Sequence, residues 1–547
     1  MTDAGKSPRA EKEEFREGPW SYVVAEGDGG ASSGGPCAVV TGCAGEPREL
    51  VLPETLGSLP VLAVGARAFQ GRRLVRSVSI PDGVESIGAY AFAQSGLTHV
   101  ELPSSVSRVG EWAFFRCRSL SSVRFSEGLL SLGRGAFAGD PLGKVRLPAS
   151  LERIEGRVFS SSASGGSARF DLSVSEGNPA FSSEAGSLYE WREDGLRLRW
   201  HFAREKRCEV VRGCESIAAS AFEGDTRIEE VVLPKTLRRI GKRAFAGCVR
   251  LGRADLPVSL VSVGEEAFRS TSLAAIELGP RVERVGPRAF AAVGPAARPG
   301  DGAGGAVSLA VDAANPRFSA REGLLLESAD DGVHLVGCFG PHPRLSLPEE
   351  VTHVEGLCFF HAGVEELRLH ARLASMAPDA FEGLDALRRL VAEAPDAEGG
   401  SVELVFPGGD ASAEGASRCI RLGDDGCLLD AAAYDGWALE YAASAGERLG
   451  FARMALGRLE RPWRLSPEAE EGYLAALRGG AEETCLALVA SHDFGPVETL
   501  AARGLLSSSI IERASREARE RADAEATAFL LELERSRFGF SKPDLSL

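Results

Sequence analysis

Histidine and cysteine side chains gather in one short part of this chain, where they could bind a metal ion. Five of the eight histidines lie within residues 334–370, together with two cysteines. Cys338 precedes His342 by four positions and Cys358 precedes His361 by three, which are spacings that structural zinc sites use. Cys358, however, stands directly before a phenylalanine of the repeat described below, where the repeat buries a small residue. Because structural zinc needs four converging ligands, we expect no metal site here.

Other chemistry is poorly supported by the sequence. The glycine-rich stretch at residues 300–305 lacks the Gly-Lys-Ser/Thr of a phosphate-binding loop, and the zinc-protease pattern His-Glu-x-x-His does not occur. Residues 428–547 contain one histidine, His492, and one cysteine, Cys485, and both are predicted to lie on helices. A catalytic site needs groups that converge. We therefore expect no enzymatic activity, no cofactor and no small-molecule substrate.

The chain is organised by a short phrase that returns every 22 or 23 residues. The phrase consists of an aliphatic residue, usually a glycine, two variable residues, a small residue and a phenylalanine. A fixed period of this length predicts a solenoid, in which each unit buries its apolar face against its neighbours. Eleven phenylalanines end the recognisable copies: Phe69, Phe92, Phe114, Phe137, Phe159, Phe222, Phe245, Phe268, Phe290, Phe359 and Phe381.

One full unit shows how each coil is expected to form. Residues 97–102 have the L-x-x-V-x-L pattern of a short solenoid strand, and Pro103 ends it because proline cannot donate to a strand ladder. Residues 105–110 are expected to turn the chain away. Residues 111–115 are predicted to form a helical or 3₁₀ turn on the opposite side, from which Phe114 fills the core.

The repeat resembles the BspA-type leucine-rich repeat family, which is found on bacterial and protozoan proteins. The resemblance covers roughly residues 60–392 and differs from the commoner leucine-rich pattern because no asparagine ladder follows the strand. It implies an α+β repeat fold, a leucine-rich repeat solenoid with short parallel strands. The strand ending of the family, an aliphatic residue followed by proline, recurs at Pro81, Pro103, Pro148, Pro234, Pro257 and Pro348.

Two gaps in the period contain the same internal phrase, Asn-Pro-x-Phe-Ser, followed by alternating strands. Alternation of this kind predicts β-hairpins, and the gaps look like the hairpin insertions that BspA-type arrays carry. We expect the insertions at about residues 163–212 and 295–346, and we expect them to leave the solenoid continuous.

The domain organisation follows from where the repeat starts and stops. We expect a disordered N-terminus at residues 1–16 and a β-hairpin cap at 17–60, since an open coil would expose its apolar face. Repeats occupy residues 61–394, and a linker follows at 395–427. Residues 428–547 are predicted to form an all-helical domain.

The helical region has its own pattern. Residues 470–492 and 495–506 are predicted to form a helix, a short turn and a helix, and residues 510–535 to form one long charged helix. The hairpins resemble ankyrin-type repeats, although the Thr-Pro-Leu-His signature of that family is absent.

The outward side chains of the strands are the candidate binding surface. Residues between the apolar positions of a strand point away from the core. Arg124, Lys144 and Arg146 fall in adjacent coils and would form a small basic patch; the alternative is a mixed solvated face with no partner. The candidate partner-binding residues are His99, Glu101, Ser122, Arg124, Lys144, Arg146, Arg253 and Asp255.

Charge and compartment narrow the function. A formal net charge of -16 disfavours nucleic acid and anionic membrane surfaces as partners. The resulting prediction is a non-catalytic scaffold that binds proteins; the alternative, implied by the family resemblance, is a bacterial surface adhesin that binds host or matrix proteins. No apolar signal region or 18-residue apolar run is seen, so we expect no membrane span and a cytoplasmic protein, with the cell surface reached by a non-standard route as the alternative.

Overall fold

The computed structural model describes most of the chain, as two compact units that are treated separately below. The units comprise Met1–Leu260 (unit 1) and Val261–Leu547 (unit 2). The described residues are 13–26, 35–159, 170–294, 307–360, 362–377, 379–394, 400–407, 410–419, 429–444 and 448–538.

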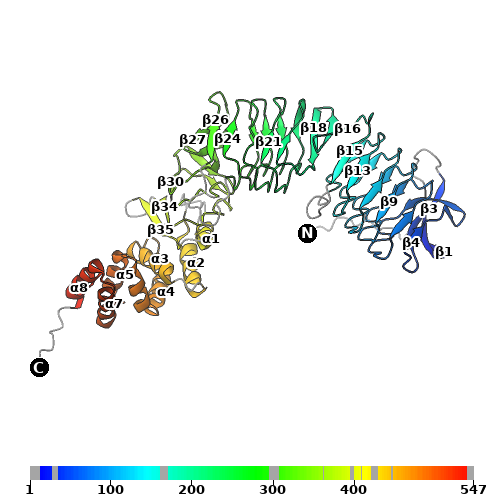
Figure 1. Cartoon of the computed structure of the whole chain (residues 1–547). Helices are drawn as coiled ribbons and strands as arrows, with labels where there is room; N and C mark the ends of the chain where they lie inside the picture. The colour runs from blue at the N-terminus through cyan, green and yellow to red at the C-terminus, as the bar shows by residue number, and fades with distance from the viewer. Residues whose placement is uncertain are drawn as a thin grey trace. The chain divides into compact units, whose positions relative to one another are not determined.

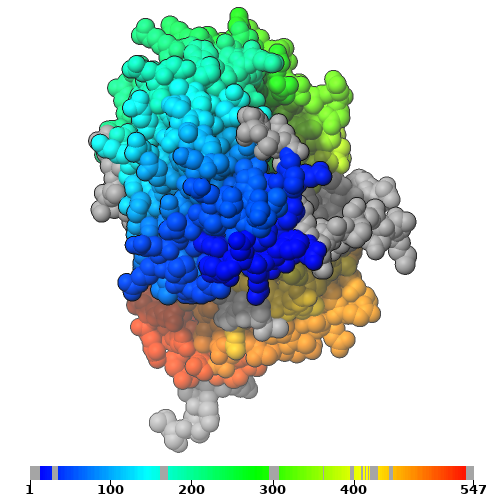
Figure 2. Space-filling view, turned by 90° about the vertical axis from the view of Figure 1, so that its right-hand side faces the viewer, coloured from blue at the N-terminus to red at the C-terminus, as the bar shows by residue number. Residues whose placement is uncertain are grey.

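Unit 1 starts with an antiparallel sheet that leads into the solenoid. Strand β1 (Glu14–Glu17) pairs with β2 (Trp20–Glu26), which pairs with β3 (Pro36–Cys43). β3 then runs parallel to β6 (Leu59–Val64), so this sheet covers the edge of the first coil. Figure 2 looks at this end of the unit, with the N-terminal residues in dark blue. The expectation of disorder through residue 16 is wrong at its end, because β1 is ordered; residues 1–12 lie outside the described part.

Each coil of unit 1 contributes to two parallel ladders (Figure 1). The predicted strands form one ladder, in which alternate side chains are exposed and buried. Its members pair as β4 with β7, β9 with β11, β13 with β15 and β19 with β21. Their bounds are β4 (Glu49–Val51), β7 (Ser77–Ser79), β9 (His99–Glu101), β11 (Ser122–Arg124), β13 (Lys144–Leu147), β15 (Asp171–Val174), β19 (Arg207–Glu209) and β21 (Glu230–Val232).

The second ladder replaces what the sequence predicts to be a plain turn. The aliphatic residue of each repeat phrase lies in a strand of two residues that pairs parallel with the next coil. Such a strand buries one side chain, which is too short a pattern to recognise from sequence. The two-residue strands of this ladder are β8 (Ser86–Ile87), β10 (Arg108–Val109), β12 (Ser131–Leu132) and β14 (Arg153–Ile154), whereas β5 (Thr55–Leu56) lies outside it and pairs antiparallel with β6.

The third side of each coil is built from turns, so the predicted helical or 3₁₀ turn at residues 111–115 is wrong. Trp112 has a φ of 56°, which is outside the helical region. Alternate backbone N–H groups donate to the next coil: Trp112 N to Arg134 O and Phe114 N to Ala136 O, both at 2.8 Å. The N–H groups between them donate within the coil, as Phe115 N does to Trp112 O at 3.0 Å, so the segment is a series of tight turns tied to the next coil.

Phenylalanines stack along the solenoid axis as a continuous spine within each block of repeats. The Phe114 ring lies 5.3 Å from the Phe92 ring and 5.0 Å from the Phe137 ring, with planes 7° and 6° apart. All three side chains are fully buried. The repeat phrase therefore ends on phenylalanine because each ring completes the packing of the rings on both sides.

The glycine of the repeat phrase is required by the close approach of neighbouring coils. A Cβ atom on Gly110 would lie 2.8 Å from Ala89 N and 2.9 Å from the carbonyl carbon of Gly88. Both distances are shorter than any side chain tolerates, and both contacts are with backbone that cannot move aside. Glycine at this place thus sets the spacing of the coils.

A polar position buried three residues after the spine phenylalanine gives a prediction about pH. Asp140 is fully buried, and its Oδ1 accepts a hydrogen bond from Cys117 N at 2.8 Å. Burial raises the pKa of the Asp140 carboxyl from 3.8 to about 9, against the opposing effect of that hydrogen bond. The folded chain therefore holds a proton that the unfolded chain releases, and the free energy of unfolding should fall as pH rises from about 4 to about 9.

Asp140→Asn should remove this dependence, because the amide keeps the acceptor and carries no charge. We expect the variant to have a higher urea midpoint than the parent near pH 8, and a difference that shrinks towards pH 4. Asp171→Asn, which changes an exposed acid on β15, is the control. A difference that is the same at both pH values would contradict the buried, protonated carboxyl.

Both gaps in the period hold antiparallel hairpins, as the sequence predicts. In unit 1, the hairpin consists of β16 (Phe181–Glu184), β17 (Ser187–Arg192) and β18 (Gly195–His201). β18 pairs parallel with β20 (Cys214–Ile217) and β20 with β22 (Arg239–Ile240), so the hairpin leads directly into the coils that follow it. Residues 160–169 lie outside the described part.

Unit 2 repeats this plan and closes it. Its hairpin, β27 (Phe318–Arg321), β28 (Leu324–Ala329) and β29 (Gly332–Cys338), pairs parallel with β31 (Val351–Val354). An antiparallel pair, β34 (Arg389–Glu393) with β35 (Ser401–Val405), ends the sheet. The other strands are β23 (Ser262–Val263), β24 (Ala275–Leu278), β25 (Arg284–Val285), β26 (Ser308–Val311), β30 (Arg344–Ser346), β32 (Glu366–Leu369) and β33 (Ser375–Met376).

Helices follow the last strand and share a hydrophobic core with the final coils of unit 2. Part of the expected linker at 395–427 is ordered, as β35 and a first helix. The described helices are α1 (Asp410–Cys419), α2 (Ala431–Ser444), α3 (Arg448–Glu460), α4 (Pro467–Arg478), α5 (Ala481–Ala490), α6 (Phe494–Ala502), α7 (Ser508–Glu520) and α8 (Ala524–Phe538).

The long helix predicted at residues 510–535 is two helices. Ala522 has a φ of 56°, which ends α7, and Asp523 Oδ1 accepts a hydrogen bond from Ala526 N at 3.0 Å at the start of α8. Aspartate is a preferred N-cap residue, so Asp523 carried the signal that the sequence analysis missed.

Candidate functional site

The predicted binding residues of the first block do lie together on one surface of unit 1. In the pairing of β9 with β11, His99 stands opposite Ser122 and Glu101 opposite Arg124. All four are exposed, and so are Lys144 and Arg146 on β13. Val100, Val123 and Val145, which lie between them, are buried in the core. We call the outward side chains of β9, β11 and β13 the strand face.

The strand face carries charges of both signs, so the basic patch expected from sequence is diluted. Arg124 Nη1 lies 3.3 Å from Glu101 Oε1, with the two side chains 77% and 63% exposed. Lys144 stands opposite Asp171 in the pairing of β13 with β15. Exposed ion pairs contribute only about 0–1 kcal/mol each, so these cations can exchange their partners for those of a bound protein at little cost.

The two remaining predicted residues belong to a second charged cluster in unit 1. Arg253 Nη2 lies 2.8 Å from Asp255 Oδ2, and the hydrogen bonds that Arg253 donates to Asp255 raise the pKa of Arg253. Arg253 Nη1 also lies 3.9 Å from Glu230 Oε1, and Arg207 Nε lies 3.4 Å from Glu230 Oε2. Arg207 lies on β19, Glu230 on β21, and Arg253 and Asp255 in the next coil, all after the inserted hairpin in the chain.

A groove in unit 2, between the last two strands and α3, was not foreseen from sequence. Its volume is 390 Å³, with Val405, Phe406 and Leu456 among its apolar walls. Arg389 Nε lies 2.7 Å from Glu403 Oε1, and Arg461 also pairs with Glu403. Burial raises the pKa of Glu403, but the hydrogen bonds and charges of these two arginines outweigh burial and hold that pKa below its ordinary value.

The sequence offered little warning of this groove. Its walls come from segments far apart in the chain, one of which lies in the predicted linker. Arg389 was a local signal, since arginine side chains commonly bind carboxylates, but the sequence does not indicate that Glu403 is its partner.

The cysteines that seemed to have zinc-like spacing are core residues. Cys338 and Cys358 are buried, and Cys338 N donates to Cys358 O at 2.8 Å. Burial raises the pKa of the Cys338 thiol to about 12 and that of the Cys358 thiol well above its ordinary value. A thiol held protonated is a poor metal ligand. His342 Nε2 lies 3.2 Å from Phe339 O, and His361 lies outside the described residues.

The two residues singled out in the helical region are also separated in role. Cys485 is buried in α5, as predicted. His492, predicted to be helical, instead lies in the turn between α5 and α6, with a φ of 56°. Its ring contacts Asp523 at 2.9 Å and Glu525 at 3.1 Å, and the hydrogen bond to Glu525 and the charge of Asp523 raise the pKa of His492. None of the described helices combines the length and apolar character that crossing a membrane requires.

Known proteins were compared with the chain at three levels. The family model described as "BspA type Leucine rich repeat region" matches six times, over residues 49–175 and 209–294. No curated protein matches the sequence. The similarity to ankyrin-type hairpins stays a prediction.

Several solved structures resemble the fold. The pneumococcal vaccine antigen PcpA has 17% identity and a TM-score of 0.47, over 70% of this chain and 94% of that one. A leucine rich cell surface protein from Faecalibacterium prausnitzii has 16% identity and a TM-score of 0.37, over 72% and 96%. The leucine rich repeat protein of T. pallidum has 25% identity and a TM-score of 0.26, over 39% and 82%.

The parallel ladders, the phenylalanine spine and the family match therefore agree with the prediction from sequence. Residues 49–175 and 209–294 are thus similar to the BspA type leucine rich repeat region.

Proposed function

We propose that this chain is a non-catalytic scaffold that binds proteins, and that the strand face is its contact surface. The observation that carries the proposal is the register of β9 with β11, which sets His99 and Glu101 beside Ser122 and Arg124, with all four side chains exposed. Repetition of this pattern in the neighbouring strand β13 produces a continuous rigid surface from short local segments. Extended repeat surfaces of this kind suit large partners.

The charge pattern favours a protein partner over a polyanion. The strand face carries one acid, Glu101, beside three cations, Arg124, Lys144 and Arg146, and the whole chain carries a net charge of -16. A nucleic acid would be repelled by such a chain, whereas a protein surface with both signs of charge can pair with the strand face residue by residue.

Reversal of the three cations tests the proposal. The partner is first captured from the native host and purified. Arg124→Glu, Lys144→Glu and Arg146→Glu together should weaken its binding to the chain by about 100-fold, because like charges placed across an interface cost several kcal/mol. The measurement is the Kd of the purified pair. The matched control reverses three exposed arginines outside the strand face, Arg108, Arg134 and Arg153, and should leave the Kd within about threefold.

Equal losses in both triple variants would contradict a specific strand face, since they would report only the change in net charge. No loss in either variant would mean that the contact lies outside the strand face.

The compartment stays a prediction: protease treatment of intact host cells digests a surface adhesin and spares a cytoplasmic scaffold.

A further inference from the structure

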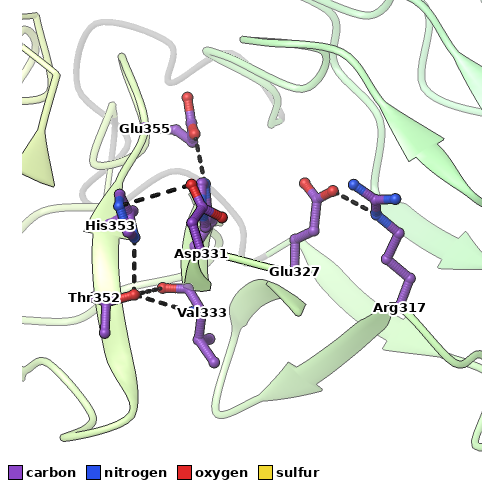
Figure 3. A network of polar contacts seen from close by, with 8 residues as sticks. Arg317, Glu327, Asp331, Val333, Thr352, His353 and Glu355 are labelled. Carbon is purple, nitrogen blue, oxygen red and sulfur yellow. Dashed lines mark hydrogen bonds and ion pairs between the residues drawn. The ribbon is translucent and has the colours of Figure 1, made fainter. Parts of the chain in front are cut away.

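Two histidines and an aspartate of unit 2 meet where the inserted hairpin joins the next coil. His334 on β29 is the pairing partner of His353 on β31, and their rings lie 4.3 Å apart and 15° from parallel. Asp331 lies in the turn between β28 and β29, where its carboxylate contacts both rings. Figure 3 shows Asp331 facing His353. The side chains of the two histidines are 17% and 18% exposed, so they are mostly buried but still reachable from solvent.

The distances between these groups suit a metal ion. His334 Nε2 lies 3.0 Å from Asp331 Oδ1, and His353 Nε2 lies 3.9 Å from Asp331 Oδ2. A tetrahedral zinc ion with bonds of about 2.0–2.1 Å holds its ligand atoms about 3.3 Å from one another. Within the described ranges, these three residues are the one group of three such side chains whose donor atoms all lie within 4.8 Å of each other.

The other nitrogen of each ring is held in the way that metal-binding histidines require. His334 Nδ1 lies 3.0 Å from Glu355 Oε1, and His353 Nδ1 lies 2.8 Å from Thr352 Oγ1 (Figure 3). Thr352 Oγ1 is itself fixed, because it accepts a hydrogen bond from Val333 N at 3.0 Å. Partners of this kind set the tautomer and orientation of metal-ligating histidines. Here they leave both Nε2 atoms facing the Asp331 carboxylate.

The first hairpin shows that the fold does not need the two histidines. At the equivalent places it has Asp194, Arg197 and Ser216, with Arg197 paired to Ser216 as His334 is to His353. Asp194 there forms an ion pair with Arg239. The same hairpin is thus closed by an ordinary ion pair in unit 1 and by imidazoles and carboxylates in unit 2.

We propose that Asp331, His334 and His353 bind one divalent transition-metal ion, of which Zn²⁺ is the best match. Imidazole and carboxylate donors suit this ion, and three protein ligands leave a fourth position for water or for a side chain of a bound protein. The histidine rings need only lean towards each other, which the soft χ2 torsion allows. The ion would fasten the hairpin turn to β31.

Metal titration of the full chain tests the proposal directly. After treatment with a chelator, the protein should bind one equivalent of Co²⁺, displaced by Zn²⁺, with visible d–d absorption and no sulfur-to-cobalt charge-transfer band. His353→Gln should abolish this equivalent. Glu355→Gln, which removes the support of His334 but no ligand, should weaken binding by about 10–100-fold.

A variant with an exposed histidine replaced, His99→Gln, should bind the ion as the parent does, and circular dichroism should show that each variant is folded.

The alternative is a network held by a proton: burial lowers the pKa of His334, but the hydrogen bonds to Glu355 and Asp331 outweigh this effect and raise it. No saturable equivalent in the parent, a charge-transfer band from thiolate, or an equivalent that survives in Asp331→Asn/His353→Gln would each overturn the proposal.

Discussion

Phe114→Ala is expected to lower the free energy of unfolding of unit 1 by about 3–5 kcal/mol. The ring is fully buried and touches a stacked ring on each side, Phe92 at 5.3 Å and Phe137 at 5.0 Å. Removing it leaves a cavity that the rigid coils cannot fill, since the backbone on this side is tied to the next coil by hydrogen bonds. The midpoint of urea unfolding and hydrogen exchange of the amides around Phe114 measure the effect.

The exposed aromatic side chain Trp191, on β17 of the same unit, provides the control. It is 57% exposed, so Trp191→Ala should change the stability by less than about 0.5 kcal/mol. In Phe114→Ala, the faster exchange should extend into the coils on both sides of the substituted one, because stability in a solenoid is shared between neighbours. A loss below 1 kcal/mol, or one without faster exchange in the adjacent coils, would mean that the spine does not hold the coils together.

Asp435→Ala should destabilise the helical region by a similar amount, about 3–5 kcal/mol. Arg458 is 2% exposed at its side chain, and its Nε and Nη2 donate to the two oxygens of Asp435 at 2.7 and 2.8 Å. Tyr473 Oη donates to Asp435 Oδ1 at 2.8 Å. Burial lowers the pKa of Arg458, but the hydrogen bonds to Asp435 raise it above its ordinary value, so in the variant its charge would remain buried without a carboxylate partner.

An exposed ion pair that uses the same helix is the matched control. Glu440, also on α2, lies 2.8 Å from Arg418 with its side chain 71% exposed. Glu440→Ala should cost at most about 1 kcal/mol. Thermal unfolding followed by circular dichroism at the helical signal compares the two variants. Equal shifts in the melting temperature would show that the Asp435–Arg458 pair does not organise α2, α3 and α4.

The fold could be predicted from sequence because the repeat phrase encodes it many times. The aliphatic residue, the glycine and the phenylalanine each have one structural reason, and the period places them in register. The two-residue strands such as β10 (Arg108–Val109) were missed because a strand that buries one side chain has no pattern to detect. The turn at Trp112 was mistaken for a helical turn because alternate N–H groups, including that of Trp112, donate to another coil, which no local propensity reveals.

The candidate sites show a similar division. Alternation within strands sufficed to predict that His99 and Arg124 are exposed, but their ion pairs depend on which residue of the next coil lies opposite. The sequence indicates the histidine-rich segment, but the spacing that suggests metal ligands there involves its cysteines. Burial keeps the thiol of Cys338 protonated. The pairing of His334 with His353 depends on the register of β29 with β31, and no spacing along the chain states that register.

The measurement that tests the central claim most directly is hydroxyl-radical footprinting of the full chain with and without its captured partner. If the strand face is the contact surface, side chains of β9, β11 and β13, such as His99 and Arg124, should be protected in the complex. The side chains of β10, β12 and β14 should react equally in both states. Two outcomes with an unchanged strand face would contradict the proposed function. One is protection of β10, β12 and β14, and the other is protection that is confined to the helices α1 to α8.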